Sequence, residues 1–247
     1  MAEERVQKLL AGAGVGSRRK VEELIGRGLV AVNGRVCKPG DKATSNDTVT
    51  VSGKVIDLSA PADGGAVIAY NKPAGKIVSR ADPGGRPTVF EDLPPLKKSR
   101  WVSMGRLDLN TSGLMIFCSD GNLAARLAHP SSGIEREYMA RVRGKAGKET
   151  LARLLRGIRI DGKTGRFEKV APAAAKDGAN KWFKITVTEG RNRFVRRMWE
   201  SCGCEVNRLI RTRFGPVKLP KNLPAGACLF ADEKLVKKLR KAAGLPL

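Results

Sequence analysis

Histidine and tyrosine are scarce in this sequence of 247 residues, which contains one histidine and two tyrosines. Nucleophilic catalysis of the Ser-His-Asp or Cys-His type needs a histidine beside the nucleophile. The single histidine, His129, is followed by a proline in a segment typical of a helix end. The sequence therefore argues against a histidine-based hydrolase.

Cysteine is also rare, and its spacing does not suggest pairing. The five cysteines are scattered, and two of them form a Cys-Gly-Cys segment at 202–204. A structural zinc site would use two Cys-x-x-Cys pairs or added histidines, and a disulfide framework is typical of short secreted chains. We expect reduced thiols and no metal site.

Long apolar runs are missing as well, because no stretch approaches the roughly 18 residues that a membrane span needs. Hydrophobic residues make up 41% and charged residues 29%, as in soluble globular proteins. The first five residues lack the basic and apolar regions of a secretory signal and the acid-free composition of a transit peptide. We expect a cytoplasmic monomer that does not enter membranes.

Acidic residues are about half as common as basic ones, 24 against 47, which gives a formal net charge of +23. Residues 1–60 hold ten basic and seven acidic side chains, a net +3, so the remainder carries 23 − 3 = +20. An excess of this size favours a polyanionic partner, with nucleic acid as the first candidate.

The N-terminal part predicts a helical hairpin followed by a small sheet. Apolar residues at helical spacing predict helices around 6–13 and 18–25, and Ser17 is placed to cap the second. Alternating apolar residues then predict strands at 30–36 and 47–51, the first containing an Asn-Gly turn.

Three segments of this part, 5–11, 16–25 and 30–36, resemble an S4 RNA-binding domain. The resemblance implies a basic face that binds the phosphate backbone. A solvated surface with scattered charges is the alternative. The residues expected on the RNA-binding face are Arg5, Lys8, Arg18, Arg19 and Lys20.

Small, turn-forming residues at 61–65 predict a linker between an S4-like domain of residues 1–60 and a second domain of residues 66–247. Helical patterns in the second domain occur at 121–129, 150–156, 193–202 and the C-terminal end. Strand patterns separate these helices, so we expect an α+β fold with a mixed, mainly antiparallel sheet flanked by helices.

A polar, glycine-bounded loop at 105–114 is predicted between two apolar strands, 101–104 and 115–117. It places a guanidinium, Arg106, close to a carboxylate, Asp108. Loops on a rigid scaffold often hold functional groups, but an aspartate in a turn often binds only neighbouring amides. The local pattern leaves both readings open.

The loop segment 105–114 is similar to the active-site signature of RNA pseudouridine synthases. Further segments that resemble this family follow across nearly the whole chain, at 70–75, 135–139, 188–198 and 208–216. Together with the S4-like part, they resemble the bacterial branch of the family that modifies ribosomal RNA. Residues 199–200 and 209–213 are most similar to its large-subunit members.

The resemblance implies roles for five residues. Asp108 would be the catalytic carboxylate, with Arg196 as its ionic partner. Tyr138 would stack on a flipped uracil, Leu209 would wall the pocket, and Arg106 would lie beside it. From the residues alone, Tyr138 and Leu209 could equally be packing residues, and any one arginine could belong to a general RNA-facing strip. The other arginines expected to contact RNA are Arg191, Arg193 and Arg197.

Two positions depart from the family pattern and leave substrate choice open. Phe194 stands where relatives often have a polar residue, and the pair at 118–119 replaces a threonine-rich pair. The expected partner is ribosomal RNA, of the large subunit, free or in an assembly intermediate. Uridine isomerisation has no net redox change and no group donor, so no cofactor is expected.

Two other functions fit parts of the sequence. One is a non-catalytic RNA-binding factor in ribosome assembly, in which the second domain only clamps RNA. The other is a basic glycosidase, which is weaker because its second carboxylate is not evident.

Overall fold

Two compact units make up the structure, a computed structural model. The first combines the chain up to Ala66 with Pro94–Val102 and Cys118–Gly121, and the second contains the rest. Of the linker expected at 61–65, only Gly65 lies within the described part. The residues that the structure describes are 3–58, 65–97, 99–173 and 180–246.

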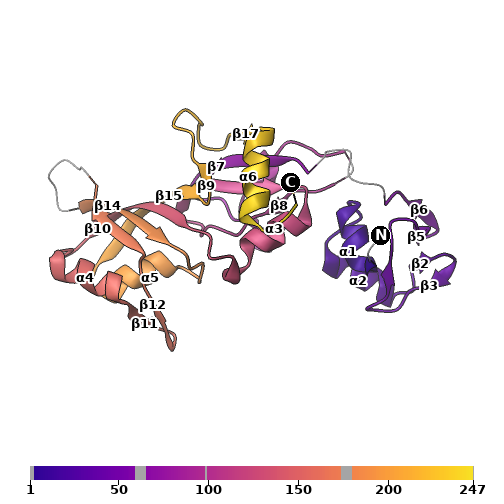
Figure 1. The fold of residues 1–247 in the computed structure, drawn as a ribbon, viewed down its shortest axis with the longest axis horizontal. Coiled ribbons are helices and arrows are strands. Elements are labelled where there is room, and N and C mark those ends of the chain that lie inside the picture. The colour runs from indigo at the N-terminus through magenta and orange to yellow at the C-terminus, as the bar shows by residue number, and fades with distance from the viewer. Residues whose placement is uncertain (1–2, 59–64, 98, 174–179, 247) are drawn as a thin grey trace. The chain divides into compact units, whose positions relative to one another are not determined.

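The N-terminal part of the first unit is the predicted helical hairpin with a small sheet (Figure 1). Its helices are α1 (Val6–Gly12) and α2 (Arg18–Gly26). Strands β1 (Glu4–Arg5) and β4 (Lys42–Ala43) pair with each other. The four-stranded sheet has the order β3 (Arg35–Val36), β2 (Val30–Val32), β5 (Val49–Val51) and β6 (Lys54–Ile56).

Local signals in this part act as expected. The side chain of Ser17 accepts a hydrogen bond from the Lys20 backbone N–H at 3.0 Å, which caps α2. Asn33 and Gly34 both have positive φ, 49° and 81°, as a tight hairpin turn between β2 and β3 requires.

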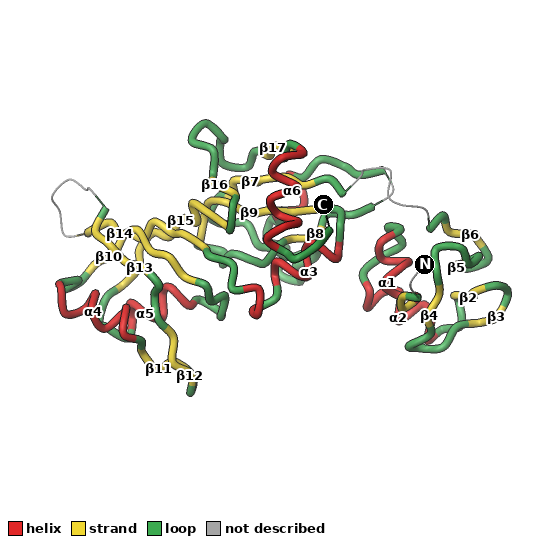
Figure 2. Tube along the Cα trace, in the orientation of Figure 1, coloured by secondary structure: helices red, strands yellow, loops and turns green. Residues whose placement is uncertain are grey.

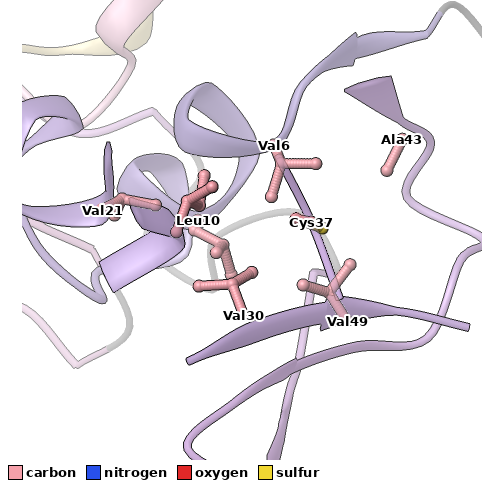
Figure 3. Packing of buried hydrophobic residues seen from close by; sticks show 8 residues of the cluster. Val6, Leu10, Val21, Val30, Cys37, Ala43 and Val49 are labelled. Carbon is pink, nitrogen blue, oxygen red and sulfur yellow. The ribbon is translucent and has the colours of Figure 1, made fainter. Parts of the chain in front are cut away.

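An aliphatic core joins the two helices to the sheet (Figure 3). Its side chains are fully or almost fully buried, and none of them carries a charge. The core residues are Val6, Leu10, Val21, Ile25, Val30, Cys37, Ala43 and Val49.

A nine-stranded sheet forms the centre of the rest of the chain. Along its main path the strands are β13 (Lys169–Pro172), β14 (Asn180–Val187), β10 (Arg136–Arg143), β15 (Glu205–Phe214), β9 (Thr111–Cys118), β7 (Val67–Lys72) and β17 (Cys228–Phe230). The short strands β8 (Val102–Ser103) and β16 (Val217–Lys218) complete it.

The sheet is mixed and mainly antiparallel, as predicted. Strand β10 pairs antiparallel with both β14 and β15, whereas β15 runs parallel to β9. The parallel pairing requires Gly113, which has φ +99° and whose added Cβ would lie 2.3 Å from the Arg211 carbonyl oxygen. The loop expected to reach residue 114 therefore ends earlier, because pairing with β15 makes Thr111 the first residue of β9.

Helices flank this sheet at its two ends (Figure 2). They are α3 (Gly121–Ala128), α4 (Lys148–Arg156), α5 (Phe194–Glu200) and α6 (Glu233–Ala242), with 3-10 turns at Val89–Asp92 and Pro130–Ser132. Helix α5 packs on β14 through Trp199 and Phe183, whose ring centroids are 4.9 Å apart. A separate hairpin, β11 (Ile158–Ile160) and β12 (Lys163–Gly165), follows α4.

All five cysteines are free thiols, as expected. His129 lies just after α3 and caps the following 3-10 turn, in agreement with a helix-end position. In the described ranges, no helix has the length and apolar character needed to cross a membrane.

Candidate active site

A cavity of about 820 Å³ opens in the second unit. Its lining comes from the loop before β9, from β10 and β15, and from the segment that leads into α5. Among the lining residues are Arg106, Asp108, Tyr138, Arg191, Arg193 and Leu209, so the fold brings together most of the site predicted from sequence.

Asp108 lies in the loop at the edge of this cavity and is partly exposed. The loop closes through a hydrogen bond from the Thr111 N–H to the Asp108 carbonyl oxygen at 3.0 Å. Neighbouring Leu107 is buried and anchors the loop, whereas Arg106 is exposed. The carboxylate of Asp108 is thus held at a place that a ligand can reach.

Lys72 supports this loop, a contact that the sequence-based prediction missed. Its side chain is fully buried, and Nζ donates to the carbonyl oxygens of Pro73, Leu109 and Thr111 at 2.9, 3.2 and 2.9 Å. Burial lowers its pKa to about 8, and the negative charge of Asp108 opposes that shift. The sequence signal that could have pointed to this role is the position of the lysine at the end of an apolar strand.

Arg196 is buried on α5, and its pKa is lowered by burial and by Arg193, while Asp108 and Glu200 act in the opposite direction. Its guanidinium donates to the carbonyl oxygens of Val206 and, at 3.0 Å, of Asn110. Within the described residues it makes no direct ion pair with Asp108, and its Nε is buried without a hydrogen-bond partner. The role of counter-ion to Asp108 stays a prediction.

Tyr138 and Leu209 come from neighbouring strands and are 8% and 4% exposed. Both line the cavity, so packing and substrate contact are compatible for each. Phe194 also lines it and is buried, with its ring against Phe167 at 6.2 Å. Phe194, which departs from the family pattern, therefore forms part of the cavity wall.

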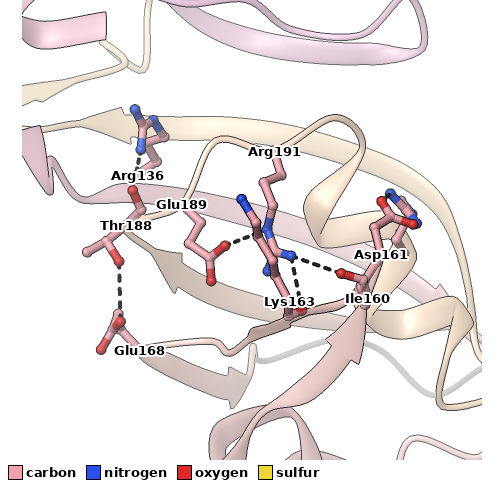
Figure 4. Close-up of polar contacts among 9 residues, drawn as sticks. Arg136, Ile160, Asp161, Lys163, Glu168, Thr188, Glu189 and Arg191 are labelled. Atoms are coloured by element: carbon pink, nitrogen blue, oxygen red, sulfur yellow. Dashed lines mark hydrogen bonds and ion pairs between the residues drawn. The ribbon is translucent and has the colours of Figure 1, made fainter. Parts of the chain in front are cut away.

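Two of the arginines expected to contact RNA bind the β11–β12 hairpin, and Figure 4 shows the contacts of one of them, Arg191. Nη1 of Arg191 donates to the carbonyl oxygens of Ile160 and Lys163, both at 3.2 Å, and its Nε pairs with Glu189 at 2.7 Å. The guanidinium of Arg197 makes two hydrogen bonds with the carboxylate of Asp161 in the hairpin turn. Contact of Arg191 and Arg197 with RNA stays a prediction.

The remaining predicted RNA contacts are more exposed. Arg193 pairs with Glu200 at 3.2 Å. In the first unit, Arg5, Arg18 and Arg19 are exposed, Lys8 pairs with Glu4, and Lys20 pairs with Glu23 at 3.2 Å. Exposed pairs of this kind contribute little to stability, which leaves these groups available to a partner.

Groups that could hold a metal are missing from the described ranges, where no cluster of three or more histidine, cysteine, aspartate or glutamate side chains occurs.

Comparisons with known proteins match this architecture. A family described as RNA pseudouridylate synthase matches residues 66–201, and the S4 domain matches residues 4–49. A ribosomal large subunit pseudouridine synthase B of Shigella flexneri is 44% identical over 246 residues, covering 98% of this chain and 84% of that protein. One of Xanthomonas campestris pv. campestris is 45% identical over 243 residues, covering 96% and 49%.

The chain spans about half the length of the curated relatives from Xanthomonas and Xylella. A crystal structure of a pseudouridylate synthase has a similar fold, with a TM-score of 0.67 at 24% identity, covering 95% of this chain and 99% of that one.

Proposed function

The chain belongs to the RNA pseudouridylate synthase family, and on this premise we propose that it isomerises a uridine of large-subunit ribosomal RNA to pseudouridine. The observation that carries the proposal is that Asp108, Tyr138 and Leu209 line one cavity. The names of the relatives support the choice of the large subunit.

In the proposed reaction, Asp108 promotes cleavage of the N1–C1′ glycosidic bond, and the bonding electron pair leaves with the base. The base turns and C5 forms a bond to C1′. Loss of the C5 proton and gain of a proton at N1 leave the composition unchanged, so no cofactor takes part. The walls of the cavity retain the free base between these steps.

The reaction needs Asp108 in its ionised form, and a nearby cation favours that form. We assign this role to Arg196, whose pKa already responds to the charge of Asp108. Lys72 is a positioning residue in this proposal, because it binds the carbonyl oxygens of Leu109 and Thr111 on the same loop.

Tyr138 is proposed to stack on the flipped uracil and to assist proton removal at C5. Leu209, opposite Ala140 in the β10–β15 pairing, would form the apolar wall for the base. Extrusion of the base from RNA costs a few kcal/mol, which binding must offset.

The basic excess and the S4 domain are proposed to supply that binding energy through phosphate contacts. Few aromatic side chains are present, so backbone electrostatics and RNA shape dominate affinity. We propose that the protein acts as a cytoplasmic monomer on ribosomal RNA or an assembly intermediate.

Replacement of Asp108 tests the function. Asp108→Asn is expected to abolish pseudouridine formation in ribosomal RNA fragments while RNA affinity stays within about twofold, because one neutralised carboxylate changes few phosphate contacts. Glu149→Gln, an exposed carboxylate on α4, is the matched control and is expected to retain full activity. Mass spectrometry of pseudouridine and a filter-binding assay provide the two readouts.

Normal pseudouridine formation by Asp108→Asn would contradict the assigned role. If the parent protein forms none on ribosomal RNA but binds it tightly, the non-catalytic assembly factor becomes the better explanation.

A further inference from the structure

Two arginines that line the cavity are buried without a carboxylate partner. Arg136 is 7% exposed and Arg211 is 1% exposed, and both border the cavity beside Tyr138. In the part of the chain that the structure describes, no ion pair links either guanidinium to an acidic side chain. Isolated buried charges are costly, so such a pair needs an explanation.

A β-bulge creates this arrangement. Arg136 lies opposite Phe214 in the β10–β15 pairing, but the register then shifts, and Tyr138 lies opposite Arg211. Thr212 is left out of the ladder, and Arg211 therefore shares the face of Tyr138. A regular strand would have turned the arginine to the other face.

The contacts of the two guanidinium groups leave donors unused. Arg136 donates to the Thr188 carbonyl oxygen at 2.7 Å (Figure 4) and to the Ile134 carbonyl oxygen at 3.1 Å. Nε of Arg211 donates to the Leu114 carbonyl oxygen at 2.7 Å, but its Nη2 is buried and has no hydrogen-bond partner in the described residues. Both groups lie near the ring of Phe214, with centroid distances of 5.4 and 5.3 Å.

Acidic residues are available nearby, but they serve the other face of the sheet. Arg213, also on β15, pairs with Glu135 at 2.6 Å and with Glu137 at 3.1 Å. These two glutamates flank Arg136 in the sequence. The glutamates on the opposite face thus pair with Arg213 and leave Arg136 and Arg211 without an acidic partner.

We propose that Arg136 and Arg211 form a cationic floor of the cavity that stabilises the negative charge on uracil as the glycosidic bond breaks. This inference rests on the proposed function. When the N1–C1′ bond breaks, its electron pair leaves with the base, and the charge spreads over N1 and the two carbonyl oxygens. Fixed positive charges in a water-poor site stabilise such a developing charge strongly.

The depth of the two arginines favours the base over a phosphate as the group they stabilise. Arg106 and Arg193 also line the cavity but are exposed, where the RNA backbone can reach them. The flipped base is the part of a nucleotide that enters an active-site pocket. Burial also lowers the pKa of Arg136, and the nearby charge of Arg211 adds to that effect, while Tyr138 opposes it.

The test uses full-length protein and RNA that contains the target uridine. Arg211→Met removes the charge and approximately keeps the length, and Arg211→Lys keeps the charge. Arg136→Met tests the second arginine. Arg141 is exposed on the same strand, β10, and Arg141→Met is the matched control. Single-turnover rates at saturating RNA and dissociation constants are measured for each.

The expected result is a rate lowered about 100-fold by Arg211→Met. Its RNA affinity should stay unchanged, and Arg211→Lys should recover a substantial part of the rate. Arg136→Met should lower the rate in the same way, and the control should match the parent. The melting temperature of Arg211→Met should not fall, because an uncompensated buried charge is removed.

A second arm changes the leaving group. In RNA with 5-fluorouridine at the target position, the departing base is less basic and needs less stabilisation. Arg211→Met should then lower the rate of glycosidic cleavage by a smaller factor than it does with uridine. A role limited to holding the sheet would give equal losses with both substrates.

Weakened RNA affinity with an unchanged saturating rate would overturn the inference in favour of phosphate binding. Equal losses for the lysine and methionine variants, or equal losses for the two substrates, would also overturn it. An inactive parent protein would instead defeat the proposed function.

Discussion

The N-terminal helical part and the cavity of the second unit use the same cationic residue types in opposite ways. In the N-terminal part, arginine and lysine side chains are exposed or paired with acids close by in the sequence. Around the cavity, four cations are buried and held largely by backbone carbonyl oxygens: Lys72, Arg136, Arg196 and Arg211.

The difference shows that net charge alone does not say what a cation does. Exposed cations act on a polyanion over a distance, are screened by salt and cost the folded protein little stability. Buried cations cost stability and act over a few ångströms in a low dielectric, where they set the charge state of other groups. The first kind is suited to binding a polyanion, and the second is suited to the local chemistry proposed for the cavity.

Glycine substitutions give the largest expected contrast between the two regions. Gly113→Ala should destabilise the protein by on the order of 4 kcal/mol or more, because its φ is positive and its Cβ would clash with the Arg211 backbone. Gly34→Ala in the N-terminal turn should cost about 1–2 kcal/mol, since φ is positive but no atom lies within 4 Å. Urea unfolding measures both, and equal costs would contradict the close β9–β15 approach.

Removal of the buried Lys72 side chain should have the next largest effect, a loss of activity. Lys72→Met is expected to lower the single-turnover rate about 100-fold, because the segment that carries Asp108 loses the hydrogen bonds to Leu109 and Thr111 and can shift by a fraction of an ångström or more. Lys54→Met, an exposed lysine of β6, should leave the rate unchanged. A full rate for Lys72→Met would remove its positioning role.

The same variant tests the lowered pKa of Lys72, about 8 in the folded protein against an ordinary 10.5. Between these pH values the unfolded chain keeps the Lys72 proton and the folded protein releases it. The contribution of Lys72 to the free energy of unfolding therefore rises with pH across this window, by up to about 3 kcal/mol. The difference between parent and Lys72→Met in chemical unfolding, from pH 8 to 10.5, should show this rise, and a flat difference would contradict it.

Charge removal in the N-terminal part should have the smallest effect. Arg18→Gln combined with Arg19→Gln should weaken RNA binding and reduce the slope of log affinity against log salt by about 1–2, without changing the rate at saturating RNA. Lys38→Gln, also exposed, provides a control for a general loss of charge. An unchanged salt slope would exclude Arg18 and Arg19 from the RNA interface.

Much of the fold was predictable from short-range patterns. The Ser17 cap, the Asn33-Gly34 turn and the apolar spacing of α1 and α2 act within a few residues, so their sequence signals suffice. The start of β9 was placed too late, because Thr111 enters the sheet through parallel pairing with Leu209, almost a hundred residues later. Residue spacing along the chain does not indicate such a pairing.

The candidate site was predictable where a motif names the residue type. Asp108, Tyr138 and Leu209 were expected together and do line one cavity. Lys72 was missed because a lysine at a strand end does not by itself identify its three acceptors, which are backbone carbonyl oxygens. Arg191 and Arg197 were expected at the RNA, and their internal partners come from a hairpin about 30 residues earlier.

The sequence of neighbouring residues thus specified the helices of the N-terminal part, the turns and the side chains available for the site, because these depend on short-range patterns. Which cations became buried depended on contacts between distant segments, and the bulge between β10 and β15 placed Arg211 on the cavity face. The strand register is set by packing across the whole sheet, so the electrostatics of the cavity emerged only when the chain had folded.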